Sequence, residues 1–236
     1  MAETGTVMAA KEVLRADAVH VDYRTPAGPA TAVADVSFGV PDSGVTVLAG
    51  RSGSGKSTML RVLGLLEWPS TGTVWYGDTD TGSLREPQRR ELRRADLAVV
   101  FQNPSDNLLE YLSVGDNLRA AAQSAGRDCA SVELLEQLGL PGSQDWRVTA
   151  LSGGQQQRLA FGCALARGSS VILADEPTSQ LDNASADLVL DTLRQLADGA
   201  IPVLVASHDP RLIELGDHLA RLEDGRLVDF TSAGAS

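Results

Sequence analysis

The chain lacks any run of apolar residues long enough to cross a bilayer. A membrane-spanning helix needs about 18 to 20 consecutive apolar residues, whereas apolar runs such as Val171–Ala174 and Ile201–Ala206 have only the length of single strands. The first residues, Met1–Glu12, also lack the basic and apolar regions of a signal peptide. We therefore expect a soluble chain, which would need a partner if it served a membrane process.

Positive charge and cysteine are also scarce. The formal net charge is −11 over 236 residues, whereas a protein that binds nucleic acid usually carries a basic face. The only dense basic cluster, Arg85–Arg94, is interrupted by Glu86 and Glu91, and we interpret it as a solvated helix face. Cys129 and Cys163 match no metal-ligand spacing. We expect no nucleic-acid partner, and we expect Cys163, in an apolar helical stretch, to be a small core residue.

Segments typical of strands and helices alternate along the chain. Residues 14–40 alternate polar and apolar side chains with a break at Pro26–Pro29, which predicts two strands joined by a turn. Further patterns predict strands at Val45–Ala49, Thr73–Tyr76, Leu97–Phe101, Val171–Asp175 and Ile201–Ser207, and helices at Lys56–Leu66, Ser152–Arg167, Ala184–Ala197 and Arg211–Leu215. This alternation favours an α/β fold whose mainly parallel sheet is covered on both faces.

Two regions depart from that alternation. Residues 103–150 show helical patterns at Asp116–Ser124 and Ser131–Leu138 and no convincing strand, so we interpret them as a helical insertion. The chain closes with a predicted hairpin around Asp224–Gly225, followed by a small polar tail, residues 231–236, which we expect to be flexible.

Residues 50–57 fit the phosphate-binding loop pattern G-x-x-x-x-G-K-[ST], after an apolar strand and before a helix. Glycines allow backbone N–H groups to turn toward phosphate oxygens, and the helix adds its positive N-terminal end. Lys56 would reach the β- and γ-phosphates, and the Ser57 hydroxyl would bind Mg²⁺. The predicted ATP-binding residues of this segment are Gly50, Arg51, Ser52, Gly53, Ser54, Gly55, Lys56, Ser57 and Thr58.

A second candidate for the same site ends the predicted strand Val171–Asp175. Open α/β sheets bind ligands at the carboxyl ends of their strands, so Asp175 would lie beside the phosphate loop as a second Mg²⁺ anchor. Glu176 follows directly and could orient or deprotonate an attacking water. An isolated Asp-Glu pair is as often a strand-end cap, but the phosphate loop favours the catalytic interpretation.

The segment Leu151-Ser152-Gly153-Gly154-Gln155 resembles the signature sequence of the ABC ATPases, and the resemblance extends from about Leu14 to Asp229. It implies a single ABC ATPase domain over residues 1–236. The family's fold is a P-loop ATPase core, here residues 14–102 and 151–230, with an N-terminal antiparallel β subdomain. Residues 103–150 would form the inserted helical subdomain, with the signature helix following it.

The resemblance assigns roles that the patterns alone do not. Tyr23 resembles the aromatic residue that stacks on adenine. Gln102 resembles the glutamine that contacts Mg²⁺ or water, and His208 the histidine that contacts the γ-phosphate. Ser179–Asp182 resembles the D-loop of the dimer interface. The implied catalytic residues are Lys56, Gln102, Glu176 and His208, the implied Mg²⁺ ligands are Ser57, Gln102 and Asp175, and the D-loop residue is Asp182.

The resemblance also implies partners. Two subunits would pack head to tail around two ATP molecules, each held by the phosphate loop of one subunit and the signature of the other. Ser152 and the N–H groups near Gly153 would face the γ-phosphate there. A homodimer is expected, although a different ATPase subunit could take the second place. A separate integral membrane permease would hold the dimer at the cytoplasmic face of the membrane, where Leu108–Leu112 would help form the groove for a permease helix.

Some details suggest a branch of the family. Leu173–Thr178 and Ser207–Arg211 resemble the branch that includes lipoprotein-release and macrolide-export ATPases, which implies export or extrusion of a substrate. Gln180 departs from the family because a small residue is common at its position, and Cys163 because an arginine is common there. Neither departure removes a catalytic group.

Two alternative functions remain to be weighed. A soluble ABC ATPase acting on nucleic acid or ribosomes usually carries tandem modules, coiled coils or basic extensions, and this sequence has none of these. A regulatory ABC subunit, which signals through a membrane partner without transport, is not distinguished from a transporter subunit by the sequence.

Overall fold

Two sheets frame the protein in the computed structural model, which describes residues 11–26 and 28–232. The first sheet is antiparallel, in the order β2 (Gly28–Pro41), β1 (Glu12–Thr25), β4 (Thr71–Tyr76) and β5 (Thr79–Asp80). The second has the order β10 (Arg226–Ser232), β9 (His218–Glu223), β3 (Val45–Ala49), β8 (Val203–Ser207), β7 (Val171–Asp175) and β6 (Leu97–Val100). Its neighbours are parallel except in the β9–β10 hairpin. The predicted α/β fold class is therefore confirmed.

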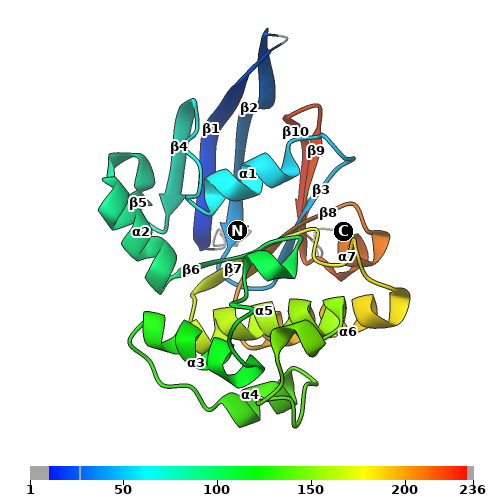
Figure 1. The fold of residues 1–236 in the computed structure, drawn as a ribbon. Coiled ribbons are helices and arrows are strands. Elements are labelled where there is room, and N and C mark those ends of the chain that lie inside the picture. Colours follow the sequence, from blue (N-terminus) through cyan, green and yellow to red (C-terminus); the bar gives the residue numbers. More distant parts are fainter. Residues whose placement is uncertain (1–10, 27, 233–236) are drawn as a thin grey trace, which may run out of the picture.

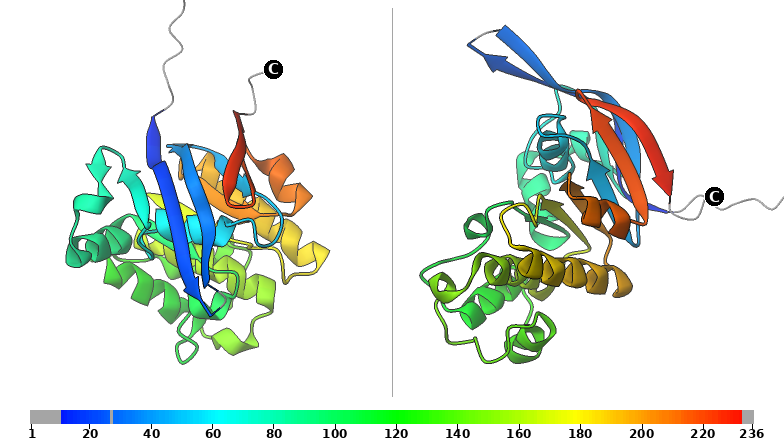
Figure 2. Two further views of the ribbon diagram at one scale, coloured as in Figure 1. Left: turned by 90° about the horizontal axis from the view of Figure 1, so that it is seen from above. Right: turned by 90° about the vertical axis from the view of Figure 1, so that its right-hand side faces the viewer.

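The helices lie on both sides of the mainly parallel sheet. Helix α1 (Lys56–Leu63) lies between the two sheets, while the β1–β2 hairpin extends past its neighbours (Figures 1 and 2). Helix α2 (Glu86–Ala95) precedes β6. The opposite end holds α3 (Val114–Ser124), α4 (Ser131–Gln137), α5 (Gly153–Arg167) and α6 (Asn183–Asp198), and α7 (Pro210–Leu215) packs on β3 and β8. Residues 103–150 thus contain α3, α4 and two short 3₁₀ turns, as the helical patterns predicted.

The central strands bury both of their faces. In β8, Val203 and Val205 enter the core formed with α3, α5, α6 and α7, while Leu204 and Ala206 enter the core formed with α1, β1 and β2. Successive side chains of a strand point to opposite faces, so a strand covered on both sides must be apolar at every position. This is why short continuous apolar runs predicted these strands correctly.

Several predicted boundaries differ from the structure by one or two residues, and two differ for a reason that the structure shows. Helix α1 ends at Leu63 rather than Leu66, because Gly64 caps it and Leu65 takes a left-handed backbone with φ of 57°. The flexible tail predicted over residues 231–236 is wrong at its start, since β10 pairs with β9 as far as Ser232. The remaining four residues of that tail lie outside the described part of the chain.

The interpretation of Arg85–Arg94 as a solvated helix face is wrong for Arg89, which is 1% exposed. Its guanidinium donates to the carbonyl oxygens of Leu65 and Glu67 at 3.3 and 3.2 Å, and its Cζ lies 3.6 Å from the centre of the Trp68 ring. The segment after α1 exposes carbonyl groups that no helical N–H can satisfy, and α2 supplies the donors. Arg89 therefore fixes the turn that follows the phosphate-loop helix.

Replacing Arg89 by alanine is expected to lower the free energy of unfolding by about 2–3 kcal/mol, because several buried carbonyl groups lose a charged donor. The neighbouring Arg90 provides the control, since its side chain is 74% exposed and its replacement by alanine should change stability by less than about 0.5 kcal/mol. Urea unfolding of both variants measures the difference. Equal effects of the two substitutions would contradict the assigned role of Arg89.

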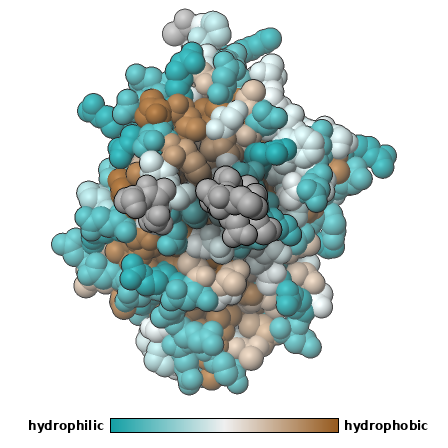
Figure 3. Space-filling model, turned by 180° about the vertical axis from the view of Figure 1, so that it is seen from behind, coloured by the Kyte–Doolittle hydropathy of each residue, from teal (hydrophilic) through white to brown (hydrophobic). Residues whose placement is uncertain are grey.

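The described part of the chain contains no membrane-spanning helix, and one of its faces is largely hydrophilic. Among residues 11–26 and 28–232, no helix combines the length and apolar character that a membrane span requires. Figure 3 shows hydrophilic residues over most of one side, with separate hydrophobic areas between them. Scattered apolar side chains of this kind are normal on a globular surface.

Candidate functional site

The loop between β3 and α1 depends on glycines at two tight positions. A Cβ at Gly50 would collide with the carbonyl oxygen of Leu222, and one at Gly55 with that of Ala32. Gly55 also has a φ of 97° and Gly53 one of 82°, both in the left-handed region that favours glycine. The loop therefore curls closely against the ends of β2 and β9, in the shape that turns backbone N–H groups inward.

Lys56 lies inside this loop with only 5% exposure. Its ammonium group donates to the carbonyl oxygens of Gly50 and Arg51 at 2.8 and 3.2 Å, and it lies 3.3 Å from Glu176 Oε1. A buried lysine is stabilised only when its charge is compensated. The loop thus holds one positive charge at its centre, where the negative charge of a phosphate group would be attracted.

The two candidate metal ligands meet at this loop. Ser57 Oγ donates to Asp175 Oδ1 over 2.9 Å, which joins the start of α1 to the end of β7. Burial raises the pKa of the Asp175 carboxyl, and the hydrogen bond from Ser57 opposes part of that rise. A hydroxyl, a carboxylate and an amide offer oxygen ligands that suit Mg²⁺. Ser57 and Gln102 line one hollow, and Asp175 reaches it only through its contact with Ser57. These residues fit the predicted metal.

Glu176 is held by contacts on several sides. Its backbone is left-handed, with φ of 43°, and its N–H donates to Ala206 O at 2.8 Å. Its carboxylate accepts a hydrogen bond from Ser207 Oγ at 3.1 Å and lies 2.9 Å from His208 Nδ1. A non-glycine residue with positive φ is uncommon and often occurs at functional sites. The ends of β7 and β8 together fix the direction of this carboxylate.

Lys56, Ser57, Gln102, Glu176 and His208 line one hollow of about 310 Å³, whereas Asp175 and Ser207 lie behind its wall. Its lining brings together many of the residues predicted from the sequence, and it also includes Ala32 and Ser179, which had no assigned contact with the site. The lining residues are Ala32, Ser52, Gly53, Gly55, Lys56, Ser57, Thr58, Gln102, Glu176, Ser179 and His208. Ala32 lies on an apolar strand, and no sequence signal marks it. Ser207, which precedes His208, could have been suspected only from its place at the end of a strand.

Other predicted residues lie apart from this hollow. Tyr23 does not line it: its hydroxyl donates to Thr58 Oγ1 at 3.4 Å and accepts from Arg61 at 3.0 Å. None of the residues 151–155 lines it either. Ser152 caps α5: its Oγ accepts a hydrogen bond from the Gln155 N–H at 3.4 Å, and its own N–H donates to Gln155 Oε1 at 2.9 Å. Asp182 caps α6 in the same way, accepting a hydrogen bond from the Ser185 N–H.

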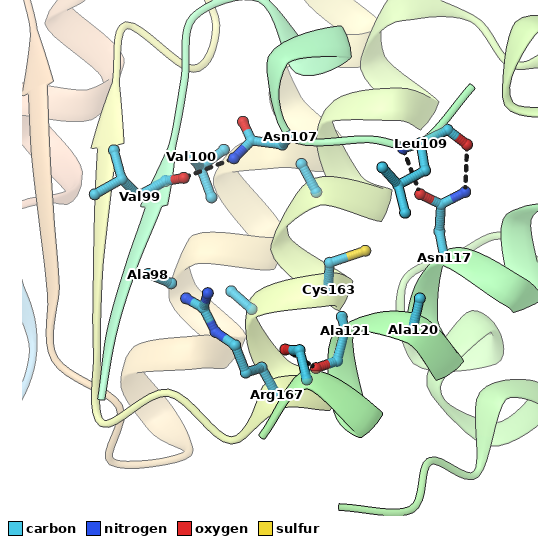
Figure 4. Close-up of a pocket in the computed structure, with 13 residues that line it drawn as sticks. Ala98, Val99, Val100, Asn107, Leu109, Asn117, Ala120, Ala121, Cys163 and Arg167 are labelled. Atoms are coloured by element: carbon cyan, nitrogen blue, oxygen red, sulfur yellow. Dashed lines mark hydrogen bonds between the residues drawn. The ribbon is translucent and has the colours of Figure 1, made fainter. Parts of the chain in front are cut away.

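A second hollow, of about 290 Å³, lies between β6, α3 and α5. Figure 4 shows the Cys163 side chain among small residues such as Ala120 and Ala121, with Arg167 at one side. Cys163 packs against the helical core, and burial raises the pKa of its thiol to about 12. The thiol is therefore protonated at neutral pH, and it forms part of the wall of an open groove.

Comparisons with known proteins agree on one family. The family model described as "ABC transporter" matches residues 33–179. The macrolide export ATP-binding/permease protein MacB of Salmonella typhimurium is 37% identical over 199 residues, which are 82% of this chain and 30% of that protein. MacB of Burkholderia thailandensis is 37% identical over 216 residues, 89% of this chain and 33% of that protein. The chain thus spans about a third of the length of these curated relatives.

Solved structures share the fold. A dimeric post-hydrolysis state of the ATP-binding cassette MJ0796, bound to ADP and Pi, superposes with a TM-score of 0.84 at 27% identity, covering 94% of this chain and all of that one. The cbiO1 protein of Clostridium perfringens, part of the transporter complex cbiONQ, gives a TM-score of 0.80 at 22% identity over 94% of this chain and 89% of that chain. The second likeness bears on the fold alone.

Proposed function

Because the chain belongs to the ABC transporter family and is an ATP-binding ATP hydrolase of that family, we propose that two copies close around two ATP molecules and power a separate membrane permease. Each ATP would bind the phosphate loop of one copy and the signature residues 151–155 of the other. The permease would hold the dimer at the cytoplasmic face of the membrane. The likeness to MacB supports a role in export or extrusion.

The observation that carries this proposal is the glycine at the start of α5. Gly153 does not need to be glycine in the isolated chain: its φ is not positive, and a Cβ there would meet only Leu181 Cδ2 at an ordinary 3.5 Å. The start of a helix presents unsatisfied N–H groups that attract anions. A glycine there allows close approach of a group from outside the chain, and the γ-phosphate held by the second copy has the required charge.

The hydrolytic roles follow from the contacts in the first hollow. Lys56 would bind the β- and γ-phosphates, and His208 would contact the γ-phosphate from the end of β8. Glu176, fixed by Ser207 and His208, would orient the attacking water and accept its proton. Mg²⁺ would be held by Ser57, Asp175 and Gln102, and when bound it neutralises part of the phosphate charge.

Two further residues complete the proposed nucleotide and dimer contacts. Tyr23 would stack on the adenine ring, and Arg61, which binds its hydroxyl, would limit the movement of the tyrosine ring. Asp182 would lie at the interface between the two copies, where it caps α6 and so fixes the D-loop.

The groove of Figure 4 would receive a helix of the permease. About half of the side chains that line it are small, which leaves room for larger ones from a partner. Leu109 lines it and is 41% exposed, while Tyr111 nearby in the sequence is 71% exposed. Only Leu108 of this segment is buried in the chain's own core. Residues 103–150 would therefore act as the helical subdomain that carries the permease contact.

Replacing Gly153 by aspartate tests the proposed dimer. The isolated chain accepts a Cβ at this position at ordinary contact distance, so urea unfolding and the affinity for ATP of the variant should equal those of the wild type. The added negative charge would repel the γ-phosphate held by the opposite copy. ATP turnover should fall by about a hundredfold or more, because two like charges brought together at an interface cost several kcal/mol. Wild-type turnover in this variant would contradict the proposal.

A further inference from the structure

Ser179 joins two of the groups that the proposed hydrolysis uses. Its hydroxyl accepts a hydrogen bond from Gln102 Nε2 at 3.0 Å and donates one to the carbonyl oxygen of Glu176 at 3.0 Å. All three residues line the hollow of about 310 Å³ at the phosphate loop. Ser179 therefore connects the segment after β6 to the strained residue at the end of β7.

The Ser179 hydroxyl carries a single hydrogen, and this determines which end of the Gln102 amide faces it. A serine hydroxyl has one hydrogen to donate, and Ser179 uses it for the Glu176 carbonyl. Toward Gln102 it can then only accept, which places the NH₂ end of the amide at Ser179. If the amide were reversed, two acceptors would compete for the one hydrogen. The contact thus leaves the oxygen end, Oε1, as the free end of Gln102.

We propose that Ser179 is a positioning residue for the metal site, because its hydroxyl sets which end of the Gln102 amide is available as a ligand. Magnesium and manganese bind amides through oxygen and not through the NH₂ group. The inference rests on the proposed function, since it takes Gln102 as one of the metal ligands. It assigns to Ser179 a role within its own subunit, in addition to the D-loop position that the sequence resemblance implied.

Replacing Ser179 by alanine removes both hydrogen bonds and frees the amide to rotate. The affinity of the purified protein for AMPPNP is measured once with Mn²⁺ and once with EDTA. The ratio of the two affinities gives the contribution of the metal to nucleotide binding. In the wild type, Mn²⁺ should tighten binding. In Ser179→Ala this tightening should be about three- to tenfold smaller, the size of one hydrogen bond, while the affinity in EDTA stays unchanged. Ser179→Thr keeps the hydroxyl and should restore the wild-type ratio.

Ser83 offers a matched control. It is exposed and donates to the carbonyl oxygen of Asp80 at 2.7 Å, three residues earlier, as Ser179 does to Glu176, but outside the hollow. Ser83→Ala should leave the Mn²⁺ ratio unchanged. If Ser179→Ala keeps the wild-type ratio of affinities with Mn²⁺ and with EDTA, the inference alone is overturned. If the affinity of the wild type is the same with Mn²⁺ and with EDTA, the proposed metal site is overturned as well. Failure of the ATP-dependent dimer to form would be seen separately, by molecular mass.

Discussion

Replacing Glu176 by glutamine is expected to lower ATP turnover by about 10²–10⁴-fold while ATP still binds. The carboxylate is 12% exposed, and it lies between the Lys56 ammonium and the Ser207 and His208 side chains. Glutamine has the same shape but cannot accept the proton of the attacking water. The contacts that position the nucleotide remain, so the loss should appear in kcat rather than in the affinity for ATP.

The measurement is steady-state ATP turnover, beside fluorescent-nucleotide binding to the same preparations. Glu214→Gln is the control, because this exposed glutamate lies on α7 away from the hollow, and its turnover should equal that of the wild type. A Glu176→Gln variant that retains more than about a tenth of wild-type turnover would show that another group activates the water.

The second large effect is expected from Lys56→Ala, which should weaken ATP binding by about ten- to a hundredfold. A hydrogen bond to a charged group contributes about 1.5–3 kcal/mol, and Lys56 supplies the one ammonium group that the described hollow contains. Its removal also leaves Glu176 without its cation at 3.3 Å, which adds uncompensated negative charge where the phosphates should bind. Turnover should fall with the affinity.

The sequence offers a direct control for this substitution. It contains two lysines, and the other, Lys11, is exposed before β1. Lys11→Ala should bind ATP as the wild type does in an equilibrium titration. If both lysine variants keep wild-type affinity, the phosphates do not bind at the loop that Lys56 occupies.

Local patterns predicted the elements of the fold that are determined by neighbouring residues. The strand Val171–Asp175 appears where its continuous apolar run predicted it. The helix that starts at Lys56 appears where the glycine-rich phosphate loop predicted it. The juxtaposition of Ser57 with Asp175 was also predictable, because the carboxyl ends of all parallel strands in a sheet lie at one edge, and β8 pairs in parallel with both β3 and β7.

Contacts between distant residues could not be predicted in this way. The close approach of Gly50 to the Leu222 carbonyl joins positions far apart in the sequence, and nothing near either residue indicates it. Arg89 appeared to belong to a solvated basic face, because its acceptors, among them the Leu65 carbonyl, come from another segment. Ser179 gained its contact with Gln102 in the same way.

The two halves of the predicted nucleotide site also lie apart within one chain. The hollow contains Lys56 and His208 but none of residues 151–155, which begin α5 instead. A second copy of the chain, which supplies its signature residues to each ATP, would explain this separation. A second copy in the site predicts that the molecular mass doubles when ATP is bound, and that the doubled mass persists when hydrolysis is slow.

The molecular mass of Glu176→Gln, measured by light scattering after size exclusion in saturating ATP and Mg²⁺, tests this most directly. The proposed two-copy site predicts a species of twice the 24.8 kDa of one chain. This species should dissociate to single chains when ATP is withdrawn, and it should not form when the same chain also carries Gly153→Asp. A mass that remains at 24.8 kDa while ATP is shown to be bound would contradict the two-copy site.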